Sequence, residues 1–264
     1  MRARLLALAL ALGLAAECVQ AQALEPSLYE VDGRMSGYLF LAETTRILQD
    51  DTFQNPGTFE VERGAQLWAD PAGADGKSCQ SCHGAAENSM KGVATRYPLY
   101  DEHADMLVNL ELRVNSEREL RMGAEPYAYE SEELVALTAF ISSQSHGMPM
   151  EVDVDGPAAT YFEQGREFYF KRRGQLDLAC SHCHDELVGW KLRGDVISQG
   201  QINGFPMYRL QWKKLASRHR VFEWCNTSLR AEPYPYGSEE YLALELYVAW
   251  RGRGLPIETP AVRR

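Results

Sequence analysis

The chain has 264 residues, of which 45% are hydrophobic, and a formal net charge of −10 at pH 7. This length predicts one or two domains with ordinary hydrophobic cores. Nucleic-acid phosphates and anionic lipid headgroups repel an acidic chain, so the charge argues against nucleic-acid and membrane binding. A small anionic substrate would need a local basic patch.

The first 23 residues have the features of a secretory signal peptide. Arg2 and Arg4 precede an apolar run over residues 5–16, and small residues suited to cleavage follow at 19–23. The run is shorter than a membrane-spanning helix, and no later stretch reaches that length. We therefore expect residues 1–23 to be removed on export to the periplasm. One of the six cysteines is lost with this segment, and five stay in the mature protein.

Residues 24–57 form a lead-in that we expect to be extended, with a short helix over residues 39–48. After it, the chain repeats itself. Gly64 and Gly165 each stand fifteen residues before a cysteine, inside a helical pattern. Three further segments recur: residues 124–127 as 231–234, 131–133 as 238–240, and 147–151 as 254–258. The repeat indicates duplication of one domain.

Each copy contains one Cys-x-x-Cys-His motif, at residues 79–83 and 180–184. In this motif the two thiols form thioether bonds to a haem and the histidine coordinates the iron. The sequence therefore predicts two covalently bound haem c groups, held by Cys79, Cys82 and His83 and by Cys180, Cys183 and His184. A zinc site or disulfides built from the same cysteines would not explain a histidine after each second cysteine.

The repeat predicts an all-α fold of two cytochrome c-like domains, residues 58–150 and 151–264, joined by a linker at 149–157. In each domain a helix leads to the attachment motif, an irregular stretch surrounds the haem, and a final helix closes the domain. Ser131 and Ser238 are suited to cap these final helices, which carry glutamates in their first turns. Apolar residues at helical spacing predict the buried face of each: Leu134, Leu137, Ile141, Leu242, Leu246 and Ala249.

One thiol of the mature chain, Cys225, has no partner. A thiolate at the vacant position of the second haem iron would be both a strong electron donor and a nucleophile, so we interpret Cys225 as the axial ligand and the reactive group. The neighbouring basic residues would favour the thiolate and attract a small dianion. They are Arg218, His219, Arg220 and Arg230. The alternatives are an inert buried cysteine and a solvated basic surface.

The repeat does not supply the same ligand to the first haem. With an offset of 107 residues, Cys225 corresponds to Arg118, beside Glu117, and neither is a plausible haem ligand. The far ligand is then one of four residues: Met122, which is nearest the equivalent place, His103, Met106 or Met90. Methionine raises and thiolate lowers the potential of a haem, so the two haems are expected to differ in potential.

Several stretches of the second copy are distinctive. They are residues 178–184, 192–206, 208–210, 225–226, 230–232, 249–252 and 254–256. These stretches resemble the SoxA family, the dihaem cytochrome c subunits of periplasmic SoxAX complexes. The similarity extends over nearly the whole mature chain and is densest in the second copy.

The resemblance implies an L-cysteine S-thiosulfotransferase, which joins thiosulfate oxidatively to a cysteine of the carrier protein SoxYZ and releases two electrons. It implies a monohaem SoxX partner and a cytochrome c as electron acceptor. Cys225 would be the catalytic sulfur, carried as a persulfide, with thiosulfate bound by Arg220 or Arg218. Dihaem members of the family usually have a cysteine ligand for the first haem where this chain has Glu117.

Two other functions are compatible with the motifs alone. In a dihaem electron carrier, Cys225 would be only a ligand or a core residue. In a thiosulfate dehydrogenase, two thiosulfates would be joined to tetrathionate without a protein acceptor. A carrier-dependent assay of a Cys225 variant separates these three functions.

Overall fold

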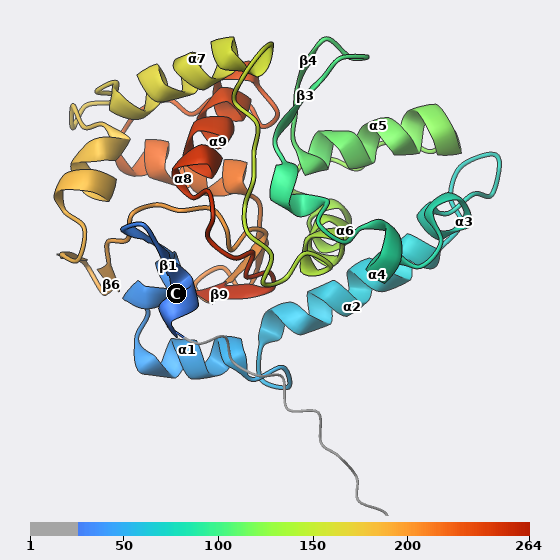
Figure 1. The fold of residues 1–264 in the computed structure, drawn as a ribbon, viewed down its shortest axis with the longest axis horizontal. Helices are drawn as coiled ribbons and strands as arrows, with labels where there is room; N and C mark the ends of the chain where they lie inside the picture. Colours follow the sequence, from blue (N-terminus) through green and yellow to red (C-terminus); the bar gives the residue numbers. More distant parts are fainter. Residues whose placement is uncertain (1–25) are drawn as a thin grey trace, which may run out of the picture.

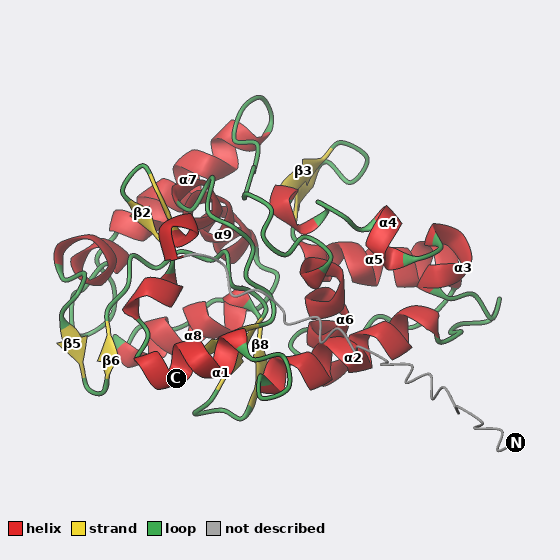
Figure 2. Ribbon diagram, turned by 60° about the horizontal axis from the view of Figure 1, so that its bottom comes forward, coloured by secondary structure: helices red, strands yellow, loops and turns green. Residues whose placement is uncertain are grey.

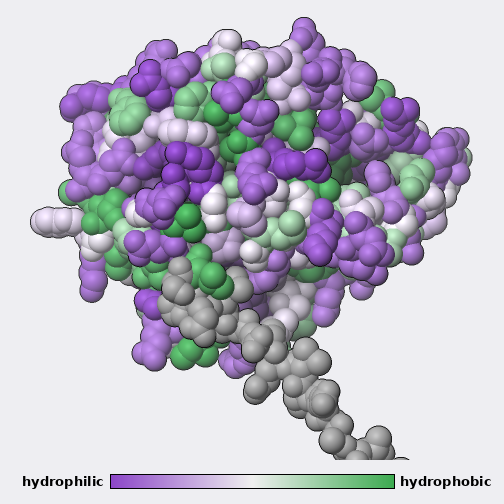
Figure 3. All heavy atoms as spheres, in the orientation of Figure 1, coloured by the Kyte–Doolittle hydropathy of each residue, from purple (hydrophilic) through white to green (hydrophobic). Residues whose placement is uncertain are grey.

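The computed structural model describes residues 26–264, and the predicted signal peptide, residues 1–23, lies outside the described residues. Figure 1 shows the helices of the first copy on one side of the molecule and those of the second copy on the other. In the described part of the chain, no helix is long and apolar enough to cross a membrane. Polar residues cover most of the face in Figure 3, and apolar residues form scattered patches.

Two pairs of packed helices form the frame. In the first copy α2 (Pro56–Ala69) packs on α6 (Glu132–Ser143), and in the second α7 (Ala158–Phe170) packs on α9 (Glu239–Arg251). The predicted leading and closing helices are therefore present in both copies.

A glycine lies at each crossing of these helices. A Cβ atom added at Gly64 would strike the carbonyl oxygen of Ala136, and one added at Gly165 would strike the carbonyl oxygen of Ala243. Because glycine has no side chain, the two backbones of each pair can approach closely. The same contact thus fixes both helix pairs.

Local sequence explains where these helices begin. The side chain of Asn55 accepts a hydrogen bond from the N–H of Gly57, and Pro56 occupies the first turn of α2. Ser131 and Ser238 cap α6 and α9 through their side chains, as predicted. The six apolar residues predicted to be buried on these helices are all 4% exposed or less, so this face is core.

Short elements connect α2 to α6 in the first copy. They are α3 (Cys79–His83), α4 (Ala86–Ser89), the 3-10 turn η3 (Ala94–Arg96), the antiparallel strands β3 (Leu99–Asp101) and β4 (Met106–Val108), and α5 (Leu110–Met122). A core cluster forms around Trp68, Leu134 and Leu137, and Cys79 packs against it. The first attachment motif therefore borders the core of its own copy.

The second copy has more strand between its two long helices. The elements are the π-helical turn η4 (His182–Glu186), β5 (Lys191–Leu192), β6 (Asp195–Val196), β7 (Met207–Arg209), β8 (Lys214–Ala216) and α8 (Arg218–Ser228). β7 pairs antiparallel with β8 and parallel with the C-terminal β9 (Ala261–Arg263), in the order β8-β7-β9. All these strands are short (Figure 2).

The prediction of an all-α fold is correct for the frame and wrong for the connections. The chain is mainly helical, with short strands in the segments that surround the attachment motifs. These segments run close to the protein interior, where backbone N–H and C=O groups need partners. Pairing between neighbouring segments supplies those partners, and helical periodicity in the sequence does not reveal it.

The lead-in packs on the C-terminal strand and is less extended than predicted. It contains η1 (Pro26–Tyr29), β1 (Glu30–Val31), β2 (Arg34–Met35), η2 (Gly37–Phe40) and α1 (Glu43–Asp50). The side-chain oxygen of Gln49 in α1 accepts hydrogen bonds from the N–H of Val262, at 2.9 Å, and from Arg263, at 2.6 Å. Figure 1 shows α1 near β9. Hydrogen bonds thus connect the N-terminal lead-in to the C-terminal strand.

The start of the predicted linker, residues 149–157, is held in place by backbone hydrogen bonds. Met150 is 1% exposed, donates its N–H to the carbonyl of Leu255 and accepts from the N–H of Gly254, both at 2.9 Å. A small apolar cluster also joins the copies, with Val61, Val135 and Ala139 from the first copy and Tyr208 and Leu215 from the second. The two copies therefore share contacts at more than one place.

Candidate functional site

The second attachment motif lies in η4, with its histidine held from behind. The Nδ1 atom of His184 is 2.8 Å from the carbonyl oxygen of Ser198, and a Cβ atom added at Gly200 would come within 2.9 Å of the ring. Burial lowers the pKa of His184, which favours the neutral imidazole. With Nδ1–H donating to the carbonyl, Nε2 is available to coordinate iron, as a haem histidine requires.

Cys225 lies in the third turn of α8, whose N-cap is Ser217. Burial and the neighbouring Cys180 raise the pKa of the Cys225 thiol to about 12, Arg209 opposes them, and Cys183 adds to the increase. Cys180 packs against the same core cluster as Val221 and Phe222 of α8, so the helix that contains Cys225 lies near the second attachment motif. A thiol in such surroundings ionises only when a strong positive partner such as a metal ion is near. A haem iron in this position fits that requirement.

The first attachment motif forms the short helix α3. A capping box fixes its start: the hydroxyl of Ser78 accepts from the N–H of Ser81, and the hydroxyl of Ser81 accepts from the N–H of Ser78, both at 3.1 Å. Burial raises the pKa of the Cys79 thiol. The ring of His83 lies 5.7 Å from that of Trp68.

The two cysteine pairs lie in different copies of the chain. Within residues 26–264 the five cysteines are free thiols, and no three His, Cys, Asp or Glu side chains gather into a metal-binding group. Disulfides and a shared zinc site are the two alternatives that the histidine of each motif argued against.

The four candidate far ligands of the first haem occupy different places. Met90 packs against the same core cluster as Cys79. Met122 is 6% exposed at the end of α5. His103 and Met106 lie on the β3–β4 hairpin, where both side chains are exposed. A haem ligand needs to project from the protein interior toward the porphyrin, so the packing favours the two methionines Met90 and Met122.

The position equivalent to Cys225 in the first copy can be found by counting from the helix N-caps. Cys225 is eight residues after Ser217, and Glu117 is eight residues after Asn109, the cap of α5. Both side chains are partly buried, and the next residue of each helix is buried. Each helix is followed by a residue with positive φ, Gly123 after α5 and Arg230 after α8, and α5 has one more residue than α8 between this residue and its N-cap. Counting with the repeat offset of 107 residues therefore gives Arg118 instead. The structural equivalent of Cys225 is therefore Glu117.

Arg218 lies in a buried polar network between the two copies. It is 3% exposed and lies 3.4 Å from a carboxylate oxygen of Glu245 in α9, and His219 is 3.0 Å from the same carboxylate. From α5, Asn109 donates to this carboxylate at 3.0 Å, and Glu111 is buried beside it. Because this guanidinium already has an enclosed carboxylate partner, the geometry favours a structural role for Arg218.

The other two arginines near the cysteine in sequence lie closer to solvent. Arg220 is partly exposed, with Nε 4.0 Å from Glu223 and its guanidinium carbon 5.3 Å from the centre of the Trp212 ring. Arg230 is exposed and donates to Gln175 at 3.4 Å. Of the two predicted thiosulfate-binding arginines, Arg220 is thus the one that a ligand could reach.

Arg209, which the sequence patterns did not single out, is the arginine that lowers the pKa of Cys225. Its side chain is 9% exposed, and the guanidinium carbon lies 4.8 Å from the centre of the ring of Trp224, the residue before Cys225. Arg209 is sixteen residues from Cys225 along the chain, and the sheet that contains β7 brings it to the site. Its one sequence signal was the resemblance of residues 208–210 to the SoxA family.

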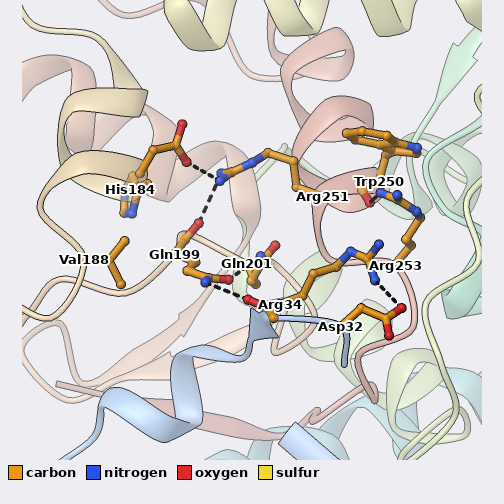
Figure 4. Close-up of a pocket in the computed structure, with 11 residues that line it drawn as sticks. Asp32, Arg34, His184, Val188, Gln199, Gln201, Trp250, Arg251 and Arg253 are labelled. Atoms are coloured by element: carbon orange, nitrogen blue, oxygen red, sulfur yellow. Dashed lines mark hydrogen bonds and ion pairs between the residues drawn. The ribbon is translucent and has the colours of Figure 1, made fainter. Parts of the chain in front are cut away.

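A pocket of about 450 Å³ opens beside His184. Figure 4 shows the side chains on its wall, among them Arg34, Gln199, Gln201, Arg251 and Arg253. Arg251 forms an ion pair with Asp185, the residue after the attachment histidine. The second attachment site is therefore accessible on its histidine side, and several arginines line the pocket there.

Two Cys-x-x-Cys-His motifs on a helical frame, one with a fixed histidine and a third thiol beside it, define the chain as a c-type cytochrome. The family model described as the SoxA/TsdA cytochrome c domain matches residues 63–150. The L-cysteine S-thiosulfotransferase subunit SoxA of Pseudaminobacter salicylatoxidans is 45% identical over 92% of this chain and 85% of its own length. The subunit of the same name from Paracoccus pantotrophus is 43% identical over 86% of this chain and 78% of its own length. The chain belongs to the SoxA family.

A solved structure supports the same assignment. The crystal structure of SoxXA from P. pantotrophus contains a chain that is 42% identical to this one, with a TM-score of 0.85, over 88% of this chain and 87% of that chain. The resemblance predicted from the sequence is thus confirmed, together with the cytochrome c class and its covalently bound haem.

Proposed function

We propose that this chain is the dihaem subunit of a periplasmic L-cysteine S-thiosulfotransferase that joins thiosulfate to a cysteine of a SoxYZ carrier protein. Its SoxA relatives carry this enzyme name. The observation that supports the chemistry is that α8, which contains Cys225, and Cys180 of the second attachment motif pack against one core cluster. In the net reaction, one sulfur–sulfur bond forms between the carrier thiolate and the outer sulfur of thiosulfate, and two electrons leave to a cytochrome acceptor.

We infer that two haem c groups are held by two domains, residues 58–150 and 151–264, which arose by duplication. Two observations support this inference. Each attachment motif stands fifteen residues after a glycine of the leading helix. These glycines, Gly64 and Gly165, make the same close contact with the carbonyl of a closing helix.

The residues around the second motif have separable roles in this proposal. The haem, when bound, supplies an electron acceptor and a positive iron that stabilises the Cys225 thiolate. His184 is oriented by the Ser198 carbonyl, and Cys225 presents its sulfur, as thiolate or persulfide, to the substrate. Arg220 is the accessible candidate for binding thiosulfate, and we assign Arg218 to the buried network.

For the first haem, His83 is the near ligand in this proposal, and the far ligand is Met122 or Met90. Met90 has the stronger support from packing, because it packs against the same core cluster as Cys79. Neither methionine is a nucleophile toward thiosulfate. The first haem is therefore assigned to electron transfer, and the bond-forming chemistry to the second.

The proposal includes a monohaem SoxX subunit as partner. The similar solved structure is a SoxXA complex, and this supports a heterodimer here.

The test is substitution of Cys225 in the haem-loaded heterodimer. Cys225→Ala is expected to lower carrier-dependent thiosulfate turnover by at least about 1000-fold, because the nucleophile is lost. The control is Thr227→Ala, an exposed residue of the same helix, which is expected to keep wild-type turnover. In the wild type, a mass increase of one sulfur atom that cyanide removes would identify the persulfide.

Two results would contradict the proposal. Undiminished carrier-dependent turnover in Cys225→Ala would leave only an electron carrier. Formation of tetrathionate by the wild type, at the same rate with and without the carrier protein, would indicate a thiosulfate dehydrogenase.

A further inference from the structure

Arg209 is a buried cation without a partner for one edge of its guanidinium group. Its side chain is 9% exposed, and its Nε and Nη2 atoms are buried and have no hydrogen-bond partner among residues 26–264. Buried charged groups are otherwise paired, because an unpaired charge loses its hydration without compensation. An anion at this edge would supply the missing partner.

The charged residues around Arg209 are already engaged with one another. Asp195, which would favour the charged form of Arg209, pairs with Arg264 at 3.6 Å. Arg263, the neighbour of Arg209 across the β7–β9 pair, binds Glu258 at 2.6 Å. Among residues 26–264, no carboxylate is therefore hydrogen-bonded to the buried edge of Arg209.

Two tryptophans fix the direction of the guanidinium. Its carbon lies 4.8 Å from the centre of the Trp224 ring and 5.3 Å from that of Trp212, and the two rings meet edge to face. The guanidinium of Arg220 also lies 5.3 Å from the Trp212 ring. Indole rings attract a guanidinium but do not neutralise it. Arg209 is thus held in place with its hydrogen-bonding capacity unused.

The free edge matches the geometry of an oxyanion. Nε and Nη2 are the two donors on one side of the guanidinium fork, and they can bind two oxygens of the same anion in parallel. Arg209 lies against Trp224, the residue before Cys225, and within electrostatic range of the Cys225 thiol. The unused donors and the reactive sulfur therefore belong to one site.

We propose that the Nε–Nη2 edge of Arg209 binds the sulfonate oxygens of thiosulfate, with Trp212 and Trp224 holding the guanidinium in position beside Cys225. This inference rests on the proposed function and adds the main substrate-binding residue, with Arg220 also beside the Trp212 ring. The bound sulfonate is neutralised by the guanidinium, so that the outer sulfur of thiosulfate can approach Cys225.

The test uses the oxidised, haem-loaded heterodimer without carrier protein, so that binding is measured apart from turnover. Equilibrium dialysis with radiolabelled thiosulfate is expected to show 10- to 100-fold weaker binding, on the order of a charged hydrogen-bond pair, for Arg209→Gln. Arg209→Lys keeps the charge but loses the fork and is expected to bind with intermediate affinity. Arg172→Gln, which removes an exposed arginine paired with Asp177, is the matched control and is expected to bind like the wild type.

A carboxylate of the second haem has the same two-oxygen chemistry and is the competing occupant. A redox titration of both haems in Arg209→Gln, without thiosulfate, separates the two. A shifted potential of the second haem with unchanged thiosulfate affinity would assign Arg209 to that carboxylate and overturn the proposal. Unchanged affinity with unchanged potentials would also overturn it. If thiosulfate binding depends on Arg209 but no carrier-dependent turnover exists, the proposed function fails and the binding site stands.

Discussion

The two copies of the domain share a helix crossing and differ at one helical position. In both copies a glycine of the leading helix touches a carbonyl of the closing helix. Eight residues after the cap of the intervening helix, the second copy has Cys225 and the first has Glu117, whose carboxylate lies 3.5 Å from Arg113 and 4.0 Å from Arg121. The two halves of the chain thus share a backbone contact and differ in the side chain at one equivalent helical position.

The surroundings of Cys225 and of Glu117 also differ. Cys225 is partly buried and follows Trp224, whose ring centre lies 4.8 Å from the guanidinium carbon of Arg209. The Nε and Nη2 atoms of Arg209 have no hydrogen-bond partner among residues 26–264. Around Glu117, two arginines on the partly exposed face of α5 form ion pairs of the kind that contribute little to stability. The arginine of the proposed anion site therefore lies near Cys225 with unpaired donors, whereas the two arginines near Glu117 are paired with it.

Substitution of a glycine at either helix crossing is expected to have the largest effect, which is on the free energy of unfolding. In Gly165→Ala the new methyl group would strike the Ala243 carbonyl and lie 2.9 Å from the Cβ of Tyr247. The helices must separate, so we expect a loss of about 3 kcal/mol or more in the free energy of unfolding. Gly64→Ala is expected to cost a similar amount, because it meets the Ala136 carbonyl. Urea unfolding of the haem-loaded protein measures both.

The two substitutions are expected to differ in function. Gly165→Ala shifts the helices around the second attachment motif and should lower thiosulfate turnover. Gly64→Ala should alter the spectrum of the first haem and spare turnover. Glu167→Ala, on the exposed face of α7, is the control and should change stability by less than about 0.5 kcal/mol. If either glycine substitution were silent in stability, the shared crossing would not be the contact that sets the frame.

The next largest expected effect is on the pH dependence of stability. It comes from the buried polar network between the copies, which contains Glu111, Glu245 and Arg218. Burial and the nearby charge of Glu245 raise the pKa of Glu111 to about 7, and Arg218 and His219 only partly offset this. The folded protein therefore favours the protonated carboxyl. The stability that Glu111 contributes is complete below its unfolded pKa, near 4.5, and is lost as the pH rises through about 7.

Glu111→Gln keeps the size of the side chain and removes its titration. Between pH 5 and pH 8 the wild type is expected to lose about 2 kcal/mol more stability than this variant, as measured by urea unfolding at each pH. Glu119→Gln, an exposed position of the same helix, should follow the wild type. Equal pH dependence in wild type and Glu111→Gln would show that this carboxyl stays ionised in the folded protein.

The sequence predicted the parts of the molecule that depend on neighbouring residues. The attachment motifs, the caps Ser131 and Ser238 and the buried faces of the closing helices are local patterns, and the structure has them as predicted. The family resemblance also came from contiguous stretches. Helical periodicity and capping reflect interactions within one or two turns, so they can be read without knowing the fold.

The parts that the sequence did not predict depend on distant partners. Arg218 begins the basic stretch before Cys225, but its partner Glu245 is 27 residues away in α9, so the sequence did not reveal that Arg218 is buried. Arg209 reaches the site through the pairing of β7 with its neighbouring strands. The lead-in packs on β9 at the opposite end of the chain. Long-range pairing decided each case, and no local pattern encodes it.

The smallest expected effect comes from placing a cysteine in the first copy at the position equivalent to Cys225. In Glu117→Cys a thiol replaces the carboxylate at the position equivalent to Cys225, at the cost of two weak surface ion pairs. Replacement of the proposed methionine ligand by this thiolate should lower the potential of the first haem, because methionine raises the potential and thiolate donates electron density to iron. A redox titration monitored by visible spectra would measure it, with the potential of the second haem unchanged. Glu119→Cys, an exposed position on α5, is the control and should change neither potential. A shift produced by Arg118→Cys instead would show that the repeat offset, and not the count from the helix caps, identifies the equivalent position.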